Sequence, residues 1–347
     1  MEEYIVGIDL GGTNVRVGLA RRSDIDSQCD KKPEILGHLK ERIAREGPNT
    51  AIAEQICRMI NEATGKAGIE RENIVAIGIA APGPLDRERG GLDHQHHMVW
   101  DIVPLVEPIR EEFNVPVALE NDNSAAALGI WQFEAMGREE VKDLKDFVYV
   151  GLGTGIGGGI IVNGELYRGR GNAAEIGHIT IVSDPNALIC SCGCPGHWEA
   201  YGSGKGLAKR TLRALEGAGG EFSALRSMVE QIEGLEGIPY VVFEAARMGD
   251  GLAERMVEET AQYNAIGFSC LLGVLDPQVI FVGGGMALGN AELVFKGIEG
   301  IPMKERVREH SVLKDIPEIV ITKLGSDATL CGAFVVGLDT ATEEDRS

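Results

Sequence analysis

The feature that most constrains this chain is a glycine-dense stretch at residues 148–162, which reads VYVGLGTGIGGGIIV. Apolar runs at its two ends predict two strands, and six of the nine residues between them are glycine. Because glycine has no Cβ, such a turn can bend tightly and bring backbone N–H groups against a phosphate. Thr154 carries the only side-chain hydroxyl in the turn. The stretch therefore predicts a phosphate-binding turn between two strands.

Two common nucleotide-binding signatures do not describe this stretch. Gly153, Gly155 and Gly158 satisfy GxGxxG, but a dinucleotide site needs a helix directly after the glycines. Here β-branched residues and an Asn-Gly turn follow, so the exit is a strand. The chain contains neither GxxxxGKS nor GxxxxGKT, which excludes a P-loop of that type. A glycine-rich hairpin without a ligand remains the alternative.

Two further glycine turns lie far from the first in the sequence. Residues 4–20 read YIVGIDLGGTNVRVGLA, a strand, a turn and a second strand. Residues 279–287 read VIFVGGGMA, in which a strand enters three glycines and a segment that could start a helix follows. Three such turns suggest a duplicated core whose halves face each other across a nucleotide.

Asp9 ends the first predicted strand, immediately before the first glycine turn. A carboxylate beside a triphosphate is unfavourable unless a cation lies between them. Asp9 therefore predicts Mg²⁺, bound through water molecules. An aspartate that only forms the turn is the alternative.

Length and charge narrow the classes of protein further. At 347 residues the chain exceeds one typical hydrophobic core, which predicts two lobes. The net charge of −20 argues against nucleic acid or an anionic membrane as a partner. Phosphates must then be held by local groups such as backbone N–H groups and a metal ion.

Cysteine usage and the N-terminal sequence predict a cytoplasmic protein. No apolar run reaches the roughly 18 residues of a membrane span. The acidic start, Met1-Glu2-Glu3, leads directly into a predicted strand and is unlike a signal peptide. Seven cysteines are an odd number, and three of them cluster, which favours thiols and a metal over disulfides.

The Cys cluster lies at residues 190–197 and reads CSCGCPGH. Soft thiolates separated by Gly and Pro turns suit a tetrahedral structural Zn²⁺. Three buried thiols without a metal are the alternative.

A second candidate site is Glu120-Asn121-Asp122. It follows a predicted strand at residues 115–119 and precedes a predicted helix at residues 123–131. An aspartate at this place can cap the helix or act as a catalyst. Phosphoryl transfer to an alcohol needs a carboxylate that accepts the hydroxyl proton. The residues alone leave both roles open.

The order of these motifs resembles the ROK family of sugar kinases and repressors. The series is DLGGTN, the Pro-Gly loop at residues 81–84, END at 120–122, GLGTGIGGG, EIGH at 175–178, the Cys cluster ending in WEAYGSG, and VGGG. The resemblance extends from about residue 5 to about residue 333. It implies an α/β, actin-like (ribonuclease H-like) fold with two lobes, a central nucleotide and sugar cleft, and a homodimer. The expected lobes are residues 1–120, completed by a C-terminal helix at 328–347, and residues 121–327, which carry the zinc loop.

The resemblance also implies roles for particular residues. Asp122 would be the general base. The implied sugar-binding residues are Pro82, Gly83, Asn121, Asp122, Glu175, His178 and Glu199. The implied ATP- and Mg²⁺-binding residues are Asp9, Gly11, Gly12, Thr13, Asn14, Gly153, Thr154, Gly155, Gly284 and Gly285.

For zinc, the family pattern is CxCGxxGC preceded by the His of EIGH. The expected ligands are His178, Cys190, Cys192 and His197, with Cys194 as the rival for the fourth position, because His197 stands where the family has its last Cys. If His178 binds zinc through one ring nitrogen, the other nitrogen can donate to a sugar hydroxyl.

The expected activity is ATP-dependent phosphorylation of the 6-hydroxyl of a hexose, with glucose the first choice. Kinases of fructose, mannose or an N-acylhexosamine (N-acetylmannosamine or N-acetylglucosamine) are the alternatives, and polyphosphate is an alternative donor. His94, His96 and His97 lie in an expected sugar-facing loop, where His97 replaces an Asn common in the family. A sugar-responsive repressor is the distant alternative. Such repressors carry a helix-turn-helix before DLGGTN, whereas only eight residues precede Asp9 here.

Overall fold

The computed structural model describes residues 2–27, 31–93, 100–135, 143–217 and 223–345. Their contacts divide the chain into two compact units. Unit 1 comprises residues 1–145, 161–167 and 322–347, and unit 2 comprises residues 146–160 and 168–321. Among the helices of the described ranges, none combines the length and the hydropathy that a membrane span needs.

Unit 1 is built on a five-stranded sheet in the order β3-β2-β1-β4-β8. The hairpin β1–β2 is antiparallel, as is the pair β2–β3, while β1, β4 and β8 run parallel. The strands are β1 Tyr4–Leu10, β2 Asn14–Arg21, β3 Leu36–Arg42, β4 Ile74–Ala81, β5 Leu85–Asp86, β6 Gly91–Asp93, β7 Ile102–Pro104 and β8 Val117–Asn121. The helices are α1 Arg22–Asp26, α2 Ala51–Ala67, η1 Arg71–Asn73, α3 Val106–Phe113, α4 Asp122–Ile130, the π-helix η2 Trp131–Ala135, η4 Gly325–Asp327 and α13 Ala328–Asp345.

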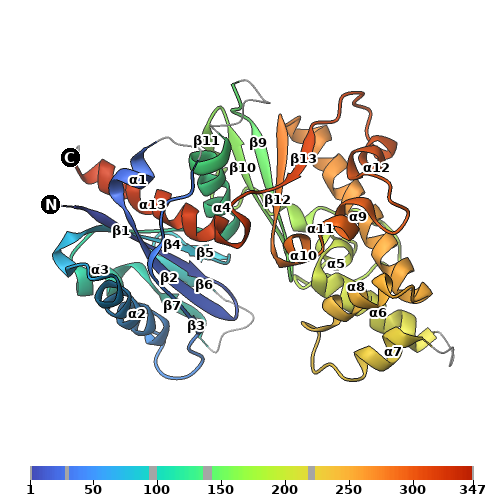
Figure 1. The fold of residues 1–347 in the computed structure, drawn as a ribbon, viewed down its shortest axis with the longest axis horizontal. Helices are drawn as coiled ribbons and strands as arrows, with labels where there is room; N and C mark the ends of the chain where they lie inside the picture. The colour runs from blue at the N-terminus through green and yellow to red at the C-terminus, as the bar shows by residue number, and fades with distance from the viewer. Residues whose placement is uncertain (1, 28–30, 94–99, 136–142, 218–222, 346–347) are drawn as a thin grey trace. The chain divides into compact units, whose positions relative to one another are not determined.

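The two faces of this sheet are covered differently. Figure 1 shows α2 and α3 on one side of the sheet and α4 and α13 on the other. Strand β4 is almost wholly buried, so its apolar residues meet helices on both faces. Helix α13 approaches α4 closely because Gly332 and Gly129 face the backbone of the other helix, where a Cβ would collide. Two glycines thus fix the C-terminal helix against the N-terminal half of the chain.

Unit 2 repeats the sheet of unit 1. Its order is β11-β10-β9-β12-β13, again a hairpin followed by two parallel strands on the β9 side. The strands are β9 Phe147–Leu152, β10 Ile156–Val162, β11 Glu165–Leu166, β12 Val279–Gly283 and β13 Glu318–Ile321, of which β11 and the end of β10 group with unit 1. The helices are η3 Ile176–His178, α5 Glu199–Gly202, α6 Gly204–Gly217, α7 Ala224–Val229, α8 Ile238–Arg247, α9 Gly251–Leu275, α10 Gly285–Gly289, α11 Ala291–Lys296 and α12 Met303–His310. The repeat is the duplicated core that the glycine turns predicted.

The bounds of the units differ from the division expected at residue 120. Residues 121–145 group with unit 1 because α4 packs on α13, and residues 322–327 group with it as well. The C-terminal helix lies in unit 1, with the N-terminal strands.

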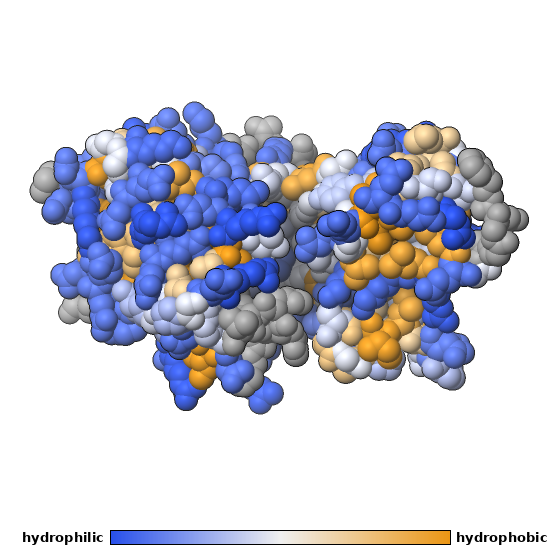
Figure 2. Space-filling view, turned by 90° about the horizontal axis from the view of Figure 1, so that it is seen from below, coloured by the Kyte–Doolittle hydropathy of each residue, from blue (hydrophilic) through white to orange (hydrophobic). Residues whose placement is uncertain are grey.

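The surface composition also differs between the units. In Figure 2, hydrophilic residues cover most of this face of unit 1, whereas apolar residues are more frequent on unit 2. Among the described large apolar side chains that are exposed, those of unit 2 are Ile189, Tyr240, Met248, Val274 and Val312.

Candidate functional site

The first glycine turn joins β1 to β2 in a tight four-residue loop. The strands are in register from Tyr4 opposite Arg21 to Leu10 opposite Val15, so residues 11–14 form the turn. Gly11 N–H donates to the Asn14 carbonyl at 2.8 Å and closes it. A Cβ on Gly12 would meet no protein atom within 4 Å, and Thr13 is exposed. The turn therefore presents open backbone, as a phosphate-binding turn requires.

Asp9 lies directly beside this turn and is paired with an arginine. Arg16 stands opposite Asp9 in the hairpin register, and its Nε and Nη2 donate to Asp9 Oδ2 at 2.8 and 2.6 Å. Both side chains are about 15% exposed. Arg16 was not predicted from the sequence, although counting outward from the four-residue turn pairs positions 9 and 16. Opposite charges at such a pair stabilise a hairpin.

Asp122 begins α4 at the carboxyl end of β8. The cap of this helix is Asn121, whose Oδ1 accepts from the backbone N–H groups of Asn123 and Ser124 at 3.0 and 3.2 Å. Asp122 Oδ1 accepts from the backbone and side-chain nitrogens of Asn123, both at 2.8 Å. Because Asn121 performs the capping, the aspartate next to it is not needed for that role.

Glu120, the first residue of the same motif, is buried and paired. Its Oε1 accepts from Arg87 Nη2 at 2.6 Å and from the Asn121 N–H at 2.8 Å. Its side chain is only 3% exposed. A buried carboxylate of this kind needs its partner, so Arg87 holds the strand end from which Asp122 projects. Sequence reasoning did not identify this pair, because 33 residues separate its members.

Three segments of unit 1 that were predicted to belong to the site lie at the same edge of its sheet. Strands β1, β4 and β8 are parallel, with Asp9 opposite Ala80 and Ala81 opposite Asn121. The glycine turn after Asp9, the Pro82-Gly83 turn and Asp122 thus follow the carboxyl ends of neighbouring strands. Ligands bind at this edge in open α/β sheets. The loop with His94, His96 and His97 lies outside the described residues.

In unit 2, the turn Gly153-Thr154-Gly155 is held by the protein itself. Gly153 N–H donates to the Gly155 carbonyl at 3.0 Å. The carbonyls of Gly153 and Thr154 accept from the N–H groups of Gly204 and Lys205, at the start of α6, at 2.9 and 3.0 Å. The Thr154 residue itself is exposed.

The third glycine turn lies beside the second. Strands β9 and β12 are parallel, with Gly151 opposite Gly283. Gly284 has a φ of +85° and packs against the backbone of Leu152, so a side chain there would be strained and would collide. A Cβ on Gly285 would meet no protein atom within 4 Å. Both predicted glycine turns of unit 2 thus lie at one edge of its sheet.

The four expected zinc ligands come together in unit 2. The ligand atoms of His178, Cys190, Cys192 and His197 all lie within 4.8 Å of one another. Cys190 Sγ is 3.6 Å from His178 Nδ1, and Cys192 Sγ is 3.2 Å from His197 Nδ1. A tetrahedral zinc with ordinary bond lengths separates sulfur from nitrogen by about 3.6 Å. The donor set and its spacing fit Zn²⁺.

Cys194, the rival ligand, is not part of this cluster among the described residues. It is exposed, and a hydrogen bond with Cys192 raises the pKa of its thiol. Burial, followed by the charge of His178, lowers the pKa of His197. A neutral imidazole is the form that binds zinc.

The two glutamates expected to bind sugar have different surroundings. Glu175 Oε2 lies 3.8 Å from His178 Nε2, the ring nitrogen that faces away from Cys190. Glu199 Oε2 instead accepts from the Ile156 N–H at 3.2 Å, and its Oε1 accepts from the Ser191 hydroxyl and from Cys190 Sγ. Glu199 therefore joins the glycine turn to residues 190–197, here called the metal loop, and this link was not predicted from the sequence.

The structure thus gathers the predicted residues into two sets. One lies along the carboxyl edge of the unit 1 sheet and carries Asp9 and Asp122. The other lies in unit 2 and carries Thr154, Glu175 and the His/Cys cluster.

Comparisons with known proteins extend over nearly the whole chain. Residues 5–339 match the model of the ROK family. The chain is 31% identical over 345 residues to a glucokinase of Streptomyces coelicolor, with 98% of each chain covered. It is 27% identical to a xylose repressor of Caldicellulosiruptor bescii, with 96% of this chain and 77% of the repressor covered.

A solved structure is similar over the same extent. It is a ROK family glucokinase from Streptomyces griseus in complex with glucose and AMPPNP, 31% identical, with a TM-score of 0.73. The match covers 97% of this chain and 99% of that chain. Together with the two sheets of equal order, it confirms the predicted α/β fold of the actin-like type.

Proposed function

Because this chain belongs to the ROK family and is a sugar kinase, we propose that it transfers the γ-phosphoryl group of ATP to the 6-hydroxyl of glucose. The observation that carries the proposal is the placement of Asp122 at the carboxyl end of β8, with the helix capped by its neighbour Asn121. This leaves a partly exposed carboxylate at the edge of the sheet where Asp9 and the first glycine turn also lie.

In the proposed reaction, Asp122 is the general base. The 6-hydroxyl oxygen attacks the γ-phosphorus, its proton passes to the Asp122 carboxylate, and the bond to the β,γ-bridging oxygen breaks to release ADP. The open backbone at Gly12 and the hydroxyl of Thr154 support roles in binding phosphate oxygens.

Asp9 is the proposed carboxylate for Mg²⁺. Both bonds from Arg16 use Oδ2, so neither uses Oδ1, and a carboxylate oxygen is a ligand that Mg²⁺ or its water molecules accept. Bound with ATP, the ion would neutralise charge on the phosphates. Arg16 holds Asp9 in one orientation through two hydrogen bonds to Oδ2.

The zinc cluster is proposed to be structural. Zinc bound by His178, Cys190, Cys192 and His197 would hold the loop in place. His178 would then bind through Nδ1, which leaves Nε2, on the side of Glu175, for a sugar hydroxyl. Glu199 supports the same loop through the hydroxyl of Ser191.

The substrate is tested by formation of the sugar phosphate with Mg²⁺ and ATP over glucose, mannose, fructose, N-acetylglucosamine and N-acetylmannosamine, with a parallel series in which polyphosphate replaces ATP. We expect the highest kcat/KM for glucose with ATP. A higher value for an N-acylhexosamine would overturn the choice of sugar, and a higher rate with polyphosphate would overturn the choice of donor.

The base is tested with Asp122→Asn. Loss of the proton acceptor should lower kcat by about 10²–10⁴-fold while glucose still binds in a calorimetric titration. The matched control is Asp26→Asn, at the exposed end of α1, which should keep the wild-type kcat. An unchanged kcat in Asp122→Asn would remove Asp122 from its proposed role.

A further inference from the structure

A row of alternating charges runs from the first glycine turn of unit 1 to the start of the C-terminal helix. Arg16 pairs with Asp9 on β1 and, through Nη1, with Asp327 Oδ1 at 3.2 Å. Asp327 Oδ2 in turn accepts from Lys32 Nζ at 2.5 Å. The row is therefore Asp9, Arg16, Asp327 and Lys32, and it joins residues more than 300 positions apart.

Arg16 is held on several sides. Its Nη2 donates both to Asp9 Oδ2 and to the Ser326 carbonyl, each at 2.6 Å. Its Nε donates to Asp9 and its Nη1 to Asp327. Four of the five N–H groups of the guanidinium are thus engaged. A planar guanidinium bound in this way has one orientation, and it transmits that orientation to the carboxylate that it holds.

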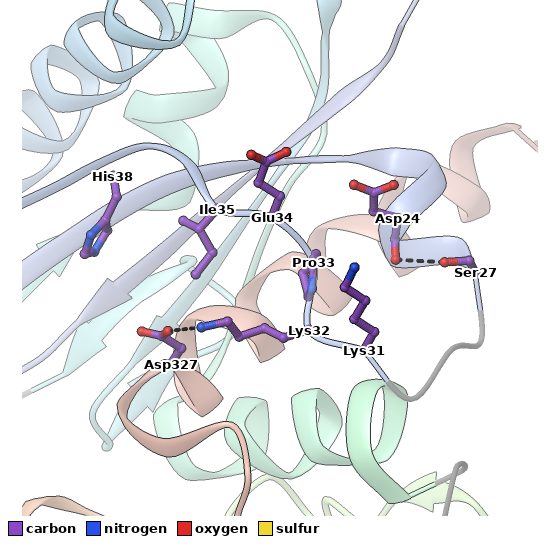
Figure 3. A pocket seen from close by; sticks show the side chains of 9 residues that line it. All are labelled: Asp24, Ser27, Lys31, Lys32, Pro33, Glu34, Ile35, His38 and Asp327. Atoms are coloured by element: carbon purple, nitrogen blue, oxygen red, sulfur yellow. Dashed lines mark hydrogen bonds and ion pairs between the residues drawn. The ribbon is translucent and has the colours of Figure 1, made fainter.

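Exposure falls along the row toward the turn. The side chain of Lys32 is 43% exposed and that of Asp327 is 23%, whereas Arg16 and Asp9 are at 15% and 16%. Figure 3 shows Lys32 and Asp327 meeting at the wall of a cavity of about 780 Å³, which His38 and Glu34 also line. The inner pair, Arg16 with Asp9, is better shielded from water and salt, so its geometry is the more strictly defined.

We propose that Asp327 is a positioning residue for phosphoryl transfer, acting through Arg16 to fix Asp9 in the orientation that serves Mg²⁺-bound nucleotide. The proposal rests on the proposed function, since it assigns a support to Asp9. Asp327 and Ser326 come from the 3-10 turn η4, immediately before α13, which packs on β1 and β4. The C-terminal helix thereby sets the position of a carboxylate at the other end of the chain.

The physical consequence of losing Asp327 is specific. Arg16 would keep Asp9 as its only carboxylate partner within the row, and the guanidinium would lose the anchor on its Nη1 side. Asp9 would then be held by a guanidinium that is anchored on its far side by the neutral Ser326 carbonyl in place of a carboxylate, so its orientation would be less strictly fixed. Supports of this kind behind a metal-binding group change metal affinity or activity by about 10–100-fold when removed.

The test measures nucleotide affinity by calorimetric titration with AMPPNP, once with Mg²⁺ and once with EDTA. Asp327→Asn should weaken binding of Mg–AMPPNP by about 10–100-fold. Binding of AMPPNP in EDTA and binding of glucose should stay within about twofold of wild type, because neither uses the orientation of Asp9. Asp327→Glu should recover most of the loss, since it keeps the charge.

A double-mutant cycle isolates the route through Asp9. In an Asp9→Asn background, Asp327→Asn should cause no further loss of Mg–AMPPNP affinity. The control is Glu41→Gln on the neighbouring strand β3, which breaks a more exposed ion pair with Arg58 of α2 and should leave Mg–AMPPNP binding unchanged.

Each outcome decides the matter. Equal weakening with Mg²⁺ and with EDTA, an additive cycle, or a loss of thermal stability without a specific loss of Mg–AMPPNP would overturn the role of Asp327. If the wild-type protein releases no ADP with any hexose, the proposed function fails. A wild-type enzyme that is active and binds Mg–AMPPNP no better than Asp327→Asn refutes the positioning role alone.

Discussion

The two glycine hairpins of this molecule share a topology and differ in what holds them. In unit 1 the turn after β1 is flanked by charge, because Asp9 pairs with Arg16 and Arg16 with Asp327. In unit 2 the turn after β9 is held by neutral backbone hydrogen bonds to the start of α6. The charged support that the described residues give it is Glu199, which accepts from the Ile156 N–H.

The difference shows how one architecture can divide the work of phosphoryl transfer. A duplicated sheet places a glycine turn at the same end of each hairpin. What each turn does then depends on the side chains around it: a carboxylate suits a cation, and uncharged backbone with a hydroxyl suits phosphate oxygens. The comparison predicts that substitutions of charged residues affect the site of unit 1, and that substitutions in the metal loop affect the site of unit 2.

The largest expected effect comes from breaking the metal loop. Cys192→Ala removes one of the four proposed ligands, so zinc measured by elemental analysis should fall from about one per chain to near zero. The midpoint of thermal unfolding should fall by roughly 5–10 °C, which corresponds to about 2–3 kcal/mol for a unit of this size. Glucose affinity should fall as well, because His178 and Glu199 both depend on the loop.

Cys194→Ala is the matched control, since this thiol is two residues away and outside the cluster. It should keep zinc, thermal stability and glucose binding. If Cys194→Ala lost the metal and Cys192→Ala kept it, the ligand set would be wrong. If the wild-type protein also contained almost no zinc, the proposed metal site would be wrong.

A smaller effect is expected on stability, and it should differ between the two glycine turns. Gly155→Ala puts a Cβ 2.5 Å from Glu199 Oε2, a carboxylate oxygen that is already bound to Ile156, and this should destabilise the protein by about 1–3 kcal/mol. Gly12→Ala meets no protein atom, so its free energy of unfolding should stay within about 0.5 kcal/mol of wild type.

Gly12→Ala should nevertheless raise the KM for ATP by roughly tenfold, because a Cβ would displace a phosphate that lies against the backbone. Urea unfolding and steady-state kinetics on the two variants check both statements. A normal KM for ATP in Gly12→Ala would show that the first turn does not approach the nucleotide.

Local sequence patterns predicted much of the fold. Alternation of glycine turns with β-branched runs predicted both hairpins, and α4 begins and ends within a residue of the helix expected at residues 123–131. The approach of Cys190, Cys192 and His197 to one another was also predictable, because Cys and His within one short loop have few other reasons to cluster. These features depend on neighbours in the sequence.

The supports of the candidate site were not predictable in the same way. Arg16 meets Asp327 across 311 residues, and Glu120 meets Arg87 across 33. An ion pair of this kind leaves no periodic signal, since any arginine could pair with any carboxylate until the topology brings two of them together. The sequence also left open whether Asp122 caps α4, and the structure gives the cap to its neighbour Asn121.

The smallest expected effect concerns two helix caps that use one geometry with different charge. Asn121 caps α4 through the N–H groups of the second and third residues after it, and Asp250 caps α9 in the same way at 3.1 and 3.0 Å. Burial raises the pKa of Asp250, but hydrogen bonds from Ala253, Ser223, Leu225 and Leu252 outweigh it and lower the pKa below 3.8.

Because the folded pKa is lowered, the charge of Asp250 stabilises unit 2 fully above the unfolded value and loses this effect as the pH falls through the folded value. Asp250→Asn keeps a capping oxygen, so at pH 7 it should cost about 0.5–1 kcal/mol, and the difference from wild type should shrink by pH 3. Urea unfolding at the two pH values measures it. Asp276→Asn, at the other end of α9, neutralises a carboxylate that caps no helix N-terminus and should show no such loss at pH 7. A difference that grows toward pH 3 would contradict the sign of the effect, because the charge of Asp250 would then not be what stabilises the cap of α9.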